Sequence, residues 1–593
     1  MAKWFVSAKK ADFNGIAEKF HIDPVIARII RNRDVVDLDE IERFLNGSLD
    51  SMHDPRGLKD IEKAAFILKE KIQNGKKIRI IGDYDVDGIC ATYILYKGLL
   101  VCGANIDAVI PHRMKDGYGI NEALVEQALM DGVDTILTCD NGIAAKSVLE
   151  DGMKKGLTCI VTDHHEVPYE EAEGEKRYIL PNVNAVVDPK QEGCAYPFSS
   201  ICGAVVAYKL IQVLLTECEM DADVIKQVER ELLEFAGIAT VCDIMPLVDE
   251  NRIIVKKALE YLKESKNPGL NALIAVNELD PAKLTSYSIG FVLGPCINAT
   301  GRLDTAQLAL ELFLSETFEE AVPLASNLKE YNINRKEMTE RGVDEAMLLL
   351  ENGEYEKDRV LVLYLPDVHE SLAGIIAGRV KEKTGKPVFV LTKGEEGVKG
   401  SARSIEAYSV YEEMTKCSHL FTKYGGHKMA AGLSLEEENI DAFRQLINEN
   451  CELTEEDFEE KILIDVPMPM GYVTRRLVDQ LSVLEPFGNG NEKPVFAQQN
   501  VIFKKAHLMG KNKNMVRFEV LDDRQRNYTL VMFKGLEEFK TYTDGKYGRG
   551  TCAQLFSDEG MNGNGLLMDI IYYPSLNEFR GRSSIQFLLQ DYK

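Results

Sequence analysis

Short apolar runs that end at acidic residues recur between residues 77 and 190, and they constrain the fold more than any other feature of this sequence. The runs are Ile78–Ile81 before Asp83, Thr135–Thr138 before Asp140, Cys159–Thr162 before Asp163 and, more weakly, Ala185–Val187 before Asp188. The stretch Ile89–Leu100, which follows the first run, has helical length and spacing. Strands that alternate with helices predict a parallel sheet.

The acidic residues of these runs belong at the edge of that sheet where ligands bind, because α/β sheets bind ligands outside the carboxyl ends of their strands. Asp83, Asp85 and Asp87 occupy alternate positions. On an extended segment their side chains point the same way, where they repel one another unless divalent cations compensate. A solvated acidic turn is the competing interpretation, and Asp140 at a separate strand end argues against it.

Two adjacent histidines, His164 and His165, follow Asp163, and Asp243 follows the apolar stretch 234–242. A single histidine is usually a satisfied polar residue. Neighbouring side chains diverge, however, so one histidine can bind metal while the other faces a substrate. Carboxylates with one imidazole suit manganese or magnesium better than structural zinc. Two such ions ~4 Å apart clamp the attacking and leaving oxygens of a phosphoryl displacement.

Basic, glycine-rich segments form a third pattern. Residues 294–302 are predicted to be an irregular loop that carries Arg302, residues 399–404 combine hydroxyls with Arg403, and Gly425–His427 allows close backbone approach. Each segment alone is typical of a surface turn. Two arginine-bearing loops on two lobes, facing an acidic metal site, indicate a cleft for a polyanion.

A chain of 593 residues is long enough for several domains. We expect a helical segment over 1–50, an α/β catalytic domain over 51–316, a connecting helix over 317–352, a second α/β lobe over 353–455 and a small β-barrel over 456–593. The net charge of −25 argues against a simple nucleic-acid coat protein but not against a nucleic-acid enzyme. No apolar stretch approaches the ~18 residues of a membrane span, and no signal peptide is recognisable. The twelve scattered cysteines favour the reducing cytoplasm.

These motifs resemble the DHH phosphoesterase superfamily, and most closely its branch of bacterial single-stranded-DNA-specific exonucleases. The resemblance runs from about residue 50 to the C-terminus. The matching segments are 82–88, 140–142, 163–165, 243–247, His369, 374–379, 400–404, 425–432 and, at the entry to an OB-fold domain, 484–488. Shorter phosphodiesterases of the superfamily lack that domain.

The resemblance implies a two-lobed core with two divalent cations, manganese or magnesium. Asp85 and Asp140 would hold one ion. Asp87, Asp140, His164 and Asp243 would hold the other, with Asp140 bridging. His165 would face the scissile phosphate, and Asp83 would support the cluster.

The resemblance also implies a set of residues that contact DNA or its terminal 5′ phosphate. This set consists of Arg113, Asn298, Arg302, His369, Ser401, Arg403, Gly426 and His427. The sequence departs from the family pattern at two positions. Cys296 stands where many relatives have arginine, which removes one charge, and Ile81 stands near where some relatives place a histidine.

The favoured function is 5′ to 3′ hydrolysis of single-stranded DNA in repair and recombination, in which polarity and DNA preference come from the resemblance. Single-strand-binding protein and a helicase are the expected protein partners, and no membrane is involved. One alternative is a phosphodiesterase of short oligonucleotides or cyclic dinucleotides, against which the C-terminal β domain argues. The other is a non-catalytic replication scaffold on the same fold, which predicts lost ligands, although none of the expected acids or histidines is missing.

Overall fold

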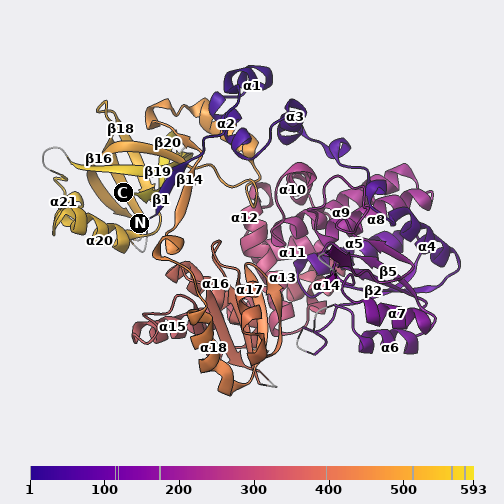
Figure 1. The fold of residues 1–593 in the computed structure, drawn as a ribbon. Coiled ribbons are helices and arrows are strands. Elements are labelled where there is room, and N and C mark those ends of the chain that lie inside the picture. The colour runs from indigo at the N-terminus through magenta and orange to yellow at the C-terminus, as the bar shows by residue number, and fades with distance from the viewer. Residues whose placement is uncertain are drawn as a thin grey trace. The chain divides into compact units, whose positions relative to one another are not determined.

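The structure is a computed structural model that describes residues 2–593 except 114, 118, 173–174, 395–396, 511–512, 514, 562–564 and 580–581. The chain forms two compact units (Figure 1). One comprises Ser48–Phe458, and the other combines Met1–Gly47 with Glu459–Lys593. The first 47 residues are therefore built into the same unit as the C-terminal domain, which the sequence pattern did not indicate.

A five-stranded parallel sheet lies at the centre of the first lobe of Ser48–Phe458, with the strand order β3-β2-β4-β5-β8. The strands are β2 (Lys77–Ile81), β3 (Asn105–Val109), β4 (Thr135–Cys139), β5 (Thr158–Thr162) and β8 (Ala185–Val187). In the sequence, a separate hairpin of β6 (Tyr169–Ala172) and β7 (Glu175–Tyr178) comes between β5 and β8. The predicted parallel sheet and its four strand-end motifs are thereby confirmed.

Helices cover both faces of this sheet (Figure 1). One face packs against α4 (Ile61–Gln73), α5 (Val86–Val101) and α8 (Gly203–Glu217), and the other against α6 (Glu122–Met130) and α7 (Lys146–Lys154). Successive strand residues point to opposite faces, so Leu137 joins the first core and Ile136 the second. Burial on both faces explains why these strands read as continuous apolar runs rather than alternating ones.

A helical region completes the lobe and leads into a long connecting helix. Its members are α9 (Ala222–Cys242), α10 (Asp249–Leu262), α11 (Pro268–Val276), α12 (Ser286–Ser288), the π-helical turn η4 (Ile289–Leu293), α13 (Gly294–Leu303), α14 (Gln307–Leu314) and the connecting α15 (Phe318–Glu351). The connecting helix lies where the sequence predicted it. Residues 294–302, predicted to be an irregular loop, are helical instead. Proline at the second helical position is compatible with a helix start, which the prediction did not weigh.

The second lobe is a mixed five-stranded sheet with the order β12-β13-β11-β10-β9. Its strands are β9 (Leu361–Tyr364), β10 (Val388–Lys393), β11 (Val398–Arg403), β12 (Phe421–His427) and β13 (Ala430–Leu435), and its helices are α16 (Ala373–Thr384), α17 (Val410–Lys416) and α18 (Ile440–Glu449). The glycine-rich stretches of this lobe therefore lie on strands β11 and β12 rather than in turns.

The other unit contains a closed β-barrel in which β16 pairs with β17 and β19, and β18 pairs with β17 and β20. Its elements are β14 (Lys461–Ile464), β15 (Val466–Pro467), α19 (Arg475–Leu481), β16 (Phe496–Met509), β17 (Met515–Leu521), β18 (Asn527–Met532), α20 (Leu536–Tyr547), α21 (Thr551–Leu555), β19 (Leu566–Phe579) and β20 (Arg582–Tyr592). The predicted small β-barrel is confirmed.

The N-terminal segment packs against this barrel. It contains β1 (Lys3–Val6), α1 (Phe13–Phe20), α2 (Pro24–Asn32) and α3 (Leu38–Asn46). Strand β1 pairs with β14, and Ile26, Ile29 and Ile30 enter the same hydrophobic core as Phe496 and Phe518. The segment is helical as predicted but has no core of its own, so its stability depends on the barrel.

Short 3₁₀ turns connect many of these elements. They are η1 (Leu49–Ser51), η2 (Pro55–Gly57), η3 (Pro281–Lys283), η5 (Glu370–Leu372), η6 (Ser418–Leu420), η7 (Glu437–Asn439), η8 (Glu455–Phe458), η9 (Met470–Tyr472) and η10 (Ser482–Leu484). Among the helices that the structure describes, none combines the length and apolar character that crossing a bilayer requires.

Candidate metal centre and phosphate pocket

The first acidic motif is bent around the start of α5 rather than extended. Asp83 lies in the turn after β2, Asp85 is the N-cap of α5, and Asp87 lies in the first helical turn. The Asp85 carboxylate accepts a hydrogen bond from the backbone N–H of Gly88 at 3.0 Å. The expectation that the three carboxylates lie on an extended segment is wrong, because the helix begins within the motif. All three nevertheless take part in the groups of ligand atoms that include Asp140 and His164.

Asp87 is fixed by the N-terminus of α8. Its two carboxylate oxygens accept hydrogen bonds from the backbone N–H groups of Gly203 at 2.7 Å and Ala204 at 2.8 Å. The first N–H groups of a helix lack partners within the helix and carry a partial positive charge, so they stabilise an anion there. Asp87 therefore keeps a defined orientation in the cluster.

Asp140 follows β4 in the left-handed backbone region, with φ of 57°. This conformation is tolerated by aspartate and asparagine better than by most other residues. Gly203 lies so close that a Cβ there would stand 2.7 Å from the Asp140 Cβ. A side chain at position 203 would displace Asp140, so the glycine is required by this close approach.

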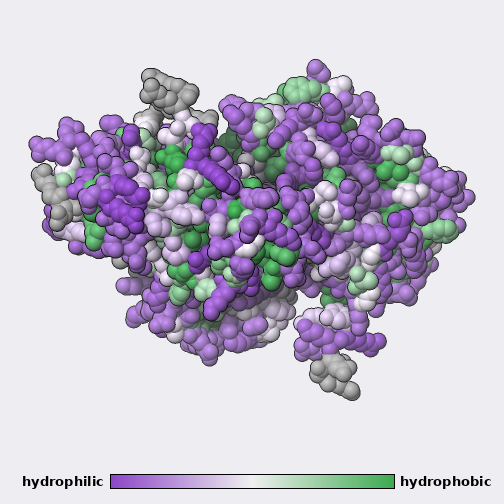
Figure 2. Space-filling model, turned by 90° about the horizontal axis from the view of Figure 1, so that it is seen from above, coloured by the Kyte–Doolittle hydropathy of each residue, from purple (hydrophilic) through white to green (hydrophobic). Residues whose placement is uncertain are grey.

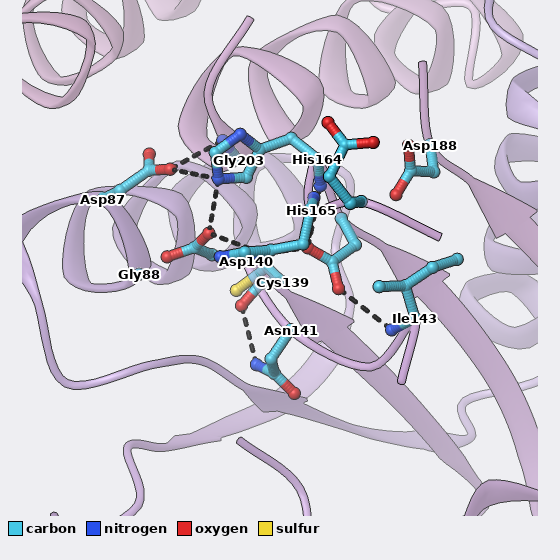
Figure 3. A network of polar contacts seen from close by, with 12 residues as sticks. Asp87, Gly88, Cys139, Asp140, Asn141, Ile143, His164, His165, Asp188 and Gly203 are labelled. Atoms are coloured by element: carbon cyan, nitrogen blue, oxygen red, sulfur yellow. Dashed lines mark hydrogen bonds and ion pairs between the residues drawn. The ribbon is translucent and has the colours of Figure 1, made fainter. Parts of the chain in front are cut away.

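His164 points into the acidic cluster (Figure 3). Its Nε2 lies 3.1 Å from the nearest Asp140 oxygen, 3.5 Å from Asp87 and 3.7 Å from Asp243. Asp243 is the C-cap of α9. A helix therefore presents Asp243, whereas strand ends present Asp140 and His164.

His165 is held by Asp163, whose carboxylate lies 2.7 Å from His165 Nδ1. The same carboxylate accepts hydrogen bonds from the backbone N–H groups of Ile143 at 2.9 Å and His164 at 2.8 Å. Burial opposes protonation of His165, but the hydrogen bond and charge of Asp163 outweigh it and raise the pKa of His165 to about 9. Asp163 is a functional position that sequence reasoning left out, although it lies within the matching motif.

The ligand atoms fall into three overlapping groups, each with all its atoms within 4.8 Å of one another. The groups are Asp83, Asp85 and Asp140; Asp87, His164 and Asp243; and Asp140, His164 and His165. We call Asp83, Asp85, Asp87, Asp140, His164 and Asp243 the acidic cluster. It unites all the predicted metal ligands with Asp83, and His165 stands at its edge.

Carboxyl groups of the acidic cluster raise one another's pKa values. Burial, followed by the charge of Asp85, raises the pKa of Asp83 to about 8. Burial, followed by the charges of Asp87 and Asp85, raises the pKa of Asp243 to about 8. One buried oxygen of each of these two residues has no hydrogen-bond partner among the described residues. Oxygen-rich donors of this kind fit hard divalent cations.

Asp188 lies at the end of β8 and is buried. Burial and the neighbouring Asp163 charge raise its pKa to about 8. Its Oδ1 accepts a hydrogen bond from the backbone N–H of Lys190 at 2.7 Å. The weak apolar run before it was the available sequence signal, but it did not lead to a functional assignment.

The second charged region is a cavity of about 470 Å³, which we call the arginine pocket. It is lined by Arg113, Arg302, Glu370, Ser371, Ala373, Gly374, Lys399, Gly400, Ser401, Arg403, Lys423, Tyr424, Gly425, Gly432, Leu433 and Ser434. Ser401 and Arg403 alternate along β11 and so share one face of the sheet. A Cβ at position 374 would approach Ser401 Oγ to 2.8 Å and Arg403 Nη2 to 2.9 Å, so Gly374 leaves room for both side chains.

The positively charged guanidinium groups of this pocket repel one another. Burial, followed by the charges of Arg113 and Arg335, lowers the pKa of Arg302 to about 10. Burial and the charge of Arg113 also lower the pKa of Arg403. Arg302 and Arg403 donate hydrogen bonds to backbone carbonyls and a hydroxyl, which carry no compensating charge. An anion in the pocket would relieve this repulsion.

Tyr84 connects the two regions, because it lies between Asp83 and Asp85 in sequence while its ring stacks under Arg113. The Arg113 guanidinium carbon is 4.9 Å from the centre of the Tyr84 ring. A Cβ at Gly301, the residue before Arg302, would lie 2.5 Å from the Tyr84 carbonyl oxygen. The arginine pocket therefore adjoins the acidic cluster within one compact unit.

Of the predicted phosphate contacts, Arg113, Arg302, Ser401 and Arg403 line the pocket, whereas Asn298, His369, Gly426 and His427 do not. Asn298 accepts a hydrogen bond from the Val86 N–H at 3.2 Å, at the start of α5. The His369 ring accepts from the Ser371 N–H at 3.3 Å. His427 is exposed on β12. Lys399 and Lys423 line the pocket, and sequence reasoning missed both because lysines occur throughout the surface.

The two positions that depart from the family pattern are buried. Cys296 lies inside α13 with its Sγ 3.4 Å from the Nδ2 of Asn332, and it does not line the pocket. Ile81 packs in the core between the sheet and α6 and α7. Both residues therefore contribute apolar packing rather than charge at their positions.

Three family models match successive parts of the chain. The DHH family N-terminal domain matches residues 77–240, the DHHA1 domain matches 357–453, and the RecJ OB domain matches 464–591. These ranges correspond to the first lobe, the second lobe and the barrel.

Several curated relatives carry the name single-stranded-DNA-specific exonuclease RecJ. The chain is 33% identical to the protein of Bacillus subtilis (strain 168) over 90% of this chain and 66% of that protein. It is 31% identical to the protein of Dickeya dadantii over 95% of both chains, and 30% identical to that of Escherichia coli (strain K12) over 96% of both.

Solved structures agree with these matches. RecJ from Thermus thermophilus in complex with Mn²⁺ superposes with a TM-score of 0.80 at 24% identity, covering 100% of this chain and 79% of that one, which shows the shared fold. A second structure, an exonuclease RecJ bound to manganese, is 32% identical with a TM-score of 0.56 and covers 66% of this chain and 94% of that one.

Proposed function

The chain belongs to the RecJ family of single-stranded-DNA-specific exonucleases, and from this premise we propose that it removes nucleotides from the 5′ end of single-stranded DNA. It is a metal-dependent exonuclease of phosphodiester bonds. The observation that carries the proposed hydrolysis at a strand end is the contact through Tyr84 between the acidic cluster and the arginine pocket, and the 5′ polarity follows from the family. We assign the acidic cluster to hydrolysis and the pocket to the terminal phosphate.

The acidic cluster would hold two divalent cations, manganese or magnesium. Asp85 and Asp140 would hold one, Asp87, Asp140, His164 and Asp243 would hold the other, and Asp83 would support both. When bound, such ions generate hydroxide near neutral pH and stabilise the charge that develops on the phosphate. The fit is supported by the unpartnered buried oxygens of Asp83 and Asp243 and by the raised pKa values of both.

His165 is positioned to face the scissile phosphate. Its Nδ1 lies 2.7 Å from the Asp163 carboxylate. Burial lowers the pKa of His165, but the hydrogen bond and charge of Asp163 raise it and favour the imidazolium, in which both ring nitrogens are donors suited to phosphate oxygens. Asp163 acts through His165 and is a positioning residue.

The arginine pocket binds the 5′ phosphate in this proposal. Arg403 supplies a guanidinium that grips phosphate bidentately, Ser401 supplies a hydroxyl from the same face of β11, and Arg113 and Arg302 supply charge from the first lobe. A phosphate fixed in the pocket places the first phosphodiester bond toward the acidic cluster. Hydrolysis there releases one terminal unit at a time.

The barrel is proposed to bind the rest of the strand. A cavity of about 380 Å³ on it is lined by Met470, Val473, Arg517, Glu519, Asn527, Tyr528, Thr529, Ile585 and Phe587. Aromatic rings beside a cation are the combination that single-strand-binding barrels use. Most aromatics of the barrel are core, as Phe503, Phe518, Tyr572 and Phe587 show, whereas Phe533 is exposed. The sequence between residues 504 and 517 is rich in cations, of which Lys504, Lys505, Lys513 and Arg517 are described and Lys511 lies outside the described residues.

Timed digestion of 5′-labelled and 3′-labelled single strands, with manganese, magnesium or a chelator, tests this function. We expect the 5′ label to appear first in the smallest product, activity with either metal, and none with chelator. Early release of the 3′ label would overturn the polarity. Chelator-resistant hydrolysis would overturn the metal assignment.

The two other functions make distinct predictions. A phosphodiesterase of very short substrates would prefer a dinucleotide to a long strand, whereas the barrel supports the opposite preference. A non-catalytic scaffold would show no hydrolysis, whereas every expected metal ligand is present and Asp140, His164 and Asp243 converge.

We further propose that the protein acts in DNA repair and recombination together with single-strand-binding protein and a helicase. A helicase would supply the unpaired strand that the substrate requires. A cytoplasmic location is supported by the twelve cysteines, which are all free thiols. Pull-down with purified candidate partners tests the protein contacts.

A further inference from the structure

Two large aromatic side chains lie exposed just before α13, Tyr287 on α12 and Phe291 on the π-helical turn η4. Tyr287 and Phe291 are 66% and 65% exposed, although hydrophilic side chains cover most of the face seen in Figure 2. Their rings are stacked on each other, with centroids 4.7 Å apart and planes inclined by 20°. Neither the metal cluster nor the arginine pocket uses them.

The turn packs against the end of the helix that presents Asp243. A Cβ at Gly290 would touch Val241 at 3.4 Å, and a Cβ at Gly294 would clash with the Sγ of Cys242 at 2.4 Å. Asp243 is the next residue after Cys242 and is the C-cap of α9. The aromatic pair is therefore anchored to the backbone that carries a metal ligand.

Ile244 adds a third exposed apolar side chain at the same place. It is 70% exposed and has a φ of 56°, in the left-handed region. A β-branched residue is strained in this conformation, and such strain is concentrated at functional sites. The π-helical turn itself belongs to a class of irregularities that is frequent at functional sites.

A single helical rod links the aromatic pair to the rest of the site. The rod consists of α12, η4 and α13, and four of its side chains lie on one side. They are spaced by four, seven and four residues, and they are Tyr287, Phe291, Asn298 and Arg302. Asn298 contacts the start of α5 beside Asp85 and Asp87, and Arg302 lines the arginine pocket. With a rise of 1.5 Å per residue, Phe291 lies about 10 Å along the rod from Asn298, on the side away from the pocket.

From this geometry we propose that Tyr287 and Phe291 form a stacking platform for the unpaired nucleobases on the 3′ side of the scissile bond. The proposal rests on the exonuclease function proposed above, because the pocket then fixes the 5′ end and the strand leaves past the acidic cluster toward the platform. Bases stack on aromatic rings without regard to sequence. A protein partner could also cover two aromatic rings, but the rod places them in line with the acidic cluster and the pocket.

The test compares two substrates that differ only in their bases. One is a 5′-phosphorylated oligothymidylate, and the other is the same strand with abasic residues at its second to fourth positions. In the wild type, KM should be lower for the strand with bases. In the double variant Tyr287→Ala, Phe291→Ala, KM for that strand should rise about tenfold while KM for the abasic strand stays within twofold, and kcat should change little.

Two further variants make the test specific. Tyr287→Phe keeps the aromatic ring, so its KM for the strand with bases should equal that of the wild type. Phe66→Ala removes another exposed aromatic ring, on α4, and should leave both KM values unchanged. Equal losses of the double variant on both substrates, or no loss on either, would overturn the proposal.

A binding measurement separates the platform from the chemistry. Phe291→Trp places an indole in the platform, and the chain otherwise has one tryptophan, Trp4, so the wild type gives the background. In chelator, oligothymidylate should quench the added fluorescence and the abasic strand should quench it less. Quenching without hydrolysis after metal is added would refute the function but keep the platform, whereas hydrolysis without quenching would refute the platform alone.

Discussion

The acidic cluster and the arginine pocket are two sites of opposite charge that solve the same physical problem in different ways. In the cluster, carboxylates are buried among carboxylates, and the pKa values of Asp83 and Asp243 rise to about 8. In the pocket, guanidinium groups are buried near one another, and the pKa of Arg302 falls to about 10. Burial of like charge shifts the proton equilibrium in both sites, and both become favourable only with a ligand of opposite charge.

They differ in how the fold builds them. The cluster is built within the first lobe, where strand ends, helix termini and the N-cap of α5 around one sheet fix its residues. The pocket is long-range, since Arg113, Arg302 and Arg403 come from segments far apart in the chain and from both lobes. The comparison predicts that damage to the cluster abolishes chemistry, while damage to the pocket changes which ends are bound.

The largest expected effect is on the cluster. Asp140→Asn should reduce hydrolysis at least about a thousandfold, because losing a bridging carboxylate removes several kcal/mol of charge stabilisation. Asparagine tolerates the left-handed backbone at this position, so the fold should persist. Labelled-strand digestion measures the loss, and circular dichroism checks the fold.

Asp151→Asn, on the surface of α7 in the same lobe, is the matched control and should keep full activity. Addition of manganese should raise the melting temperature of the wild type more than that of Asp140→Asn, because the ligand stabilises only a folded state that binds it. Near-normal turnover of a folded Asp140→Asn protein would contradict the two-ion assignment.

A buried carboxyl outside the cluster sharpens the comparison. Burial raises the pKa of Glu234 to about 7, against 4.5 for the exposed group, although Ser265 donates a hydrogen bond to it. The folded state therefore holds the proton more tightly, and stability falls as pH rises from 4.5 through 7. Ionising the buried Glu234 carboxyl therefore lowers the free energy of unfolding by ~3 kcal/mol at pH 8, and Glu234→Gln should remove this loss. The difference in stability between Glu234→Gln and the wild type should become smaller toward pH 5.

Calorimetric melting temperatures at the two pH values measure this effect. Glu345→Gln, on the exposed side of α15, is the control and should show no pH-dependent gain. Manganese should not change the gap between wild type and Glu234→Gln, since Glu234 is not a cluster residue. A gain that is equal at both pH values would refute the assigned burial penalty.

Damage to the pocket should have a smaller and more selective effect. Arg403→Ala should lower the preference for a 5′-phosphorylated over a hydroxyl-ended strand about tenfold, because a charge-assisted hydrogen bond to phosphate is worth ~1.5–3 kcal/mol. Arg403→Lys keeps the charge but loses the two parallel N–H donors of the guanidinium, so its preference for the phosphorylated strand should lie between those of the wild type and Arg403→Ala. The ratio of kcat/KM for the two substrates is the measurement.

Lys383→Ala, on the neighbouring helix α16 but outside the pocket, should leave that ratio unchanged. If Arg403→Ala keeps the wild-type ratio while its activity on both strands falls together, Arg403 supports the lobe and does not bind the end.

The smallest expected effect comes from removing the barrel. A cut near residue 456 alone would leave Ile26, Ile29 and Ile30 without the core they share with the barrel, so the appropriate fragment is 48–458. It should retain hydrolysis of very short strands, show a severalfold higher KM for long ones, and bind long strands with a weaker salt dependence, because fewer counterions are released.

Steady-state kinetics on a long and a short oligonucleotide at two salt concentrations decide the point. Equal losses on both lengths would show that the barrel supports folding or protein contacts rather than DNA binding.

The amino-acid sequence by itself determined the parallel sheet, the connecting helix, the small barrel and the residues of the acidic cluster. Apolar runs fix strands through burial on both faces, and parallel strands bring their carboxyl ends to one edge, so Asp83, Asp140 and His164 could be grouped without coordinates. The family resemblance supplied the pocket residues one by one.

Only the tertiary structure decided which of these residues meet. It started α5 inside the acidic motif and made residues 294–303 a helix. It joined the first 47 residues to the barrel. The apolar face of an amphipathic segment shows that the segment packs against another element, but the sequence does not show which element that is. The tertiary structure also exposed Tyr287 and Phe291 together, since burial of an aromatic ring depends on neighbours that are distant in the chain.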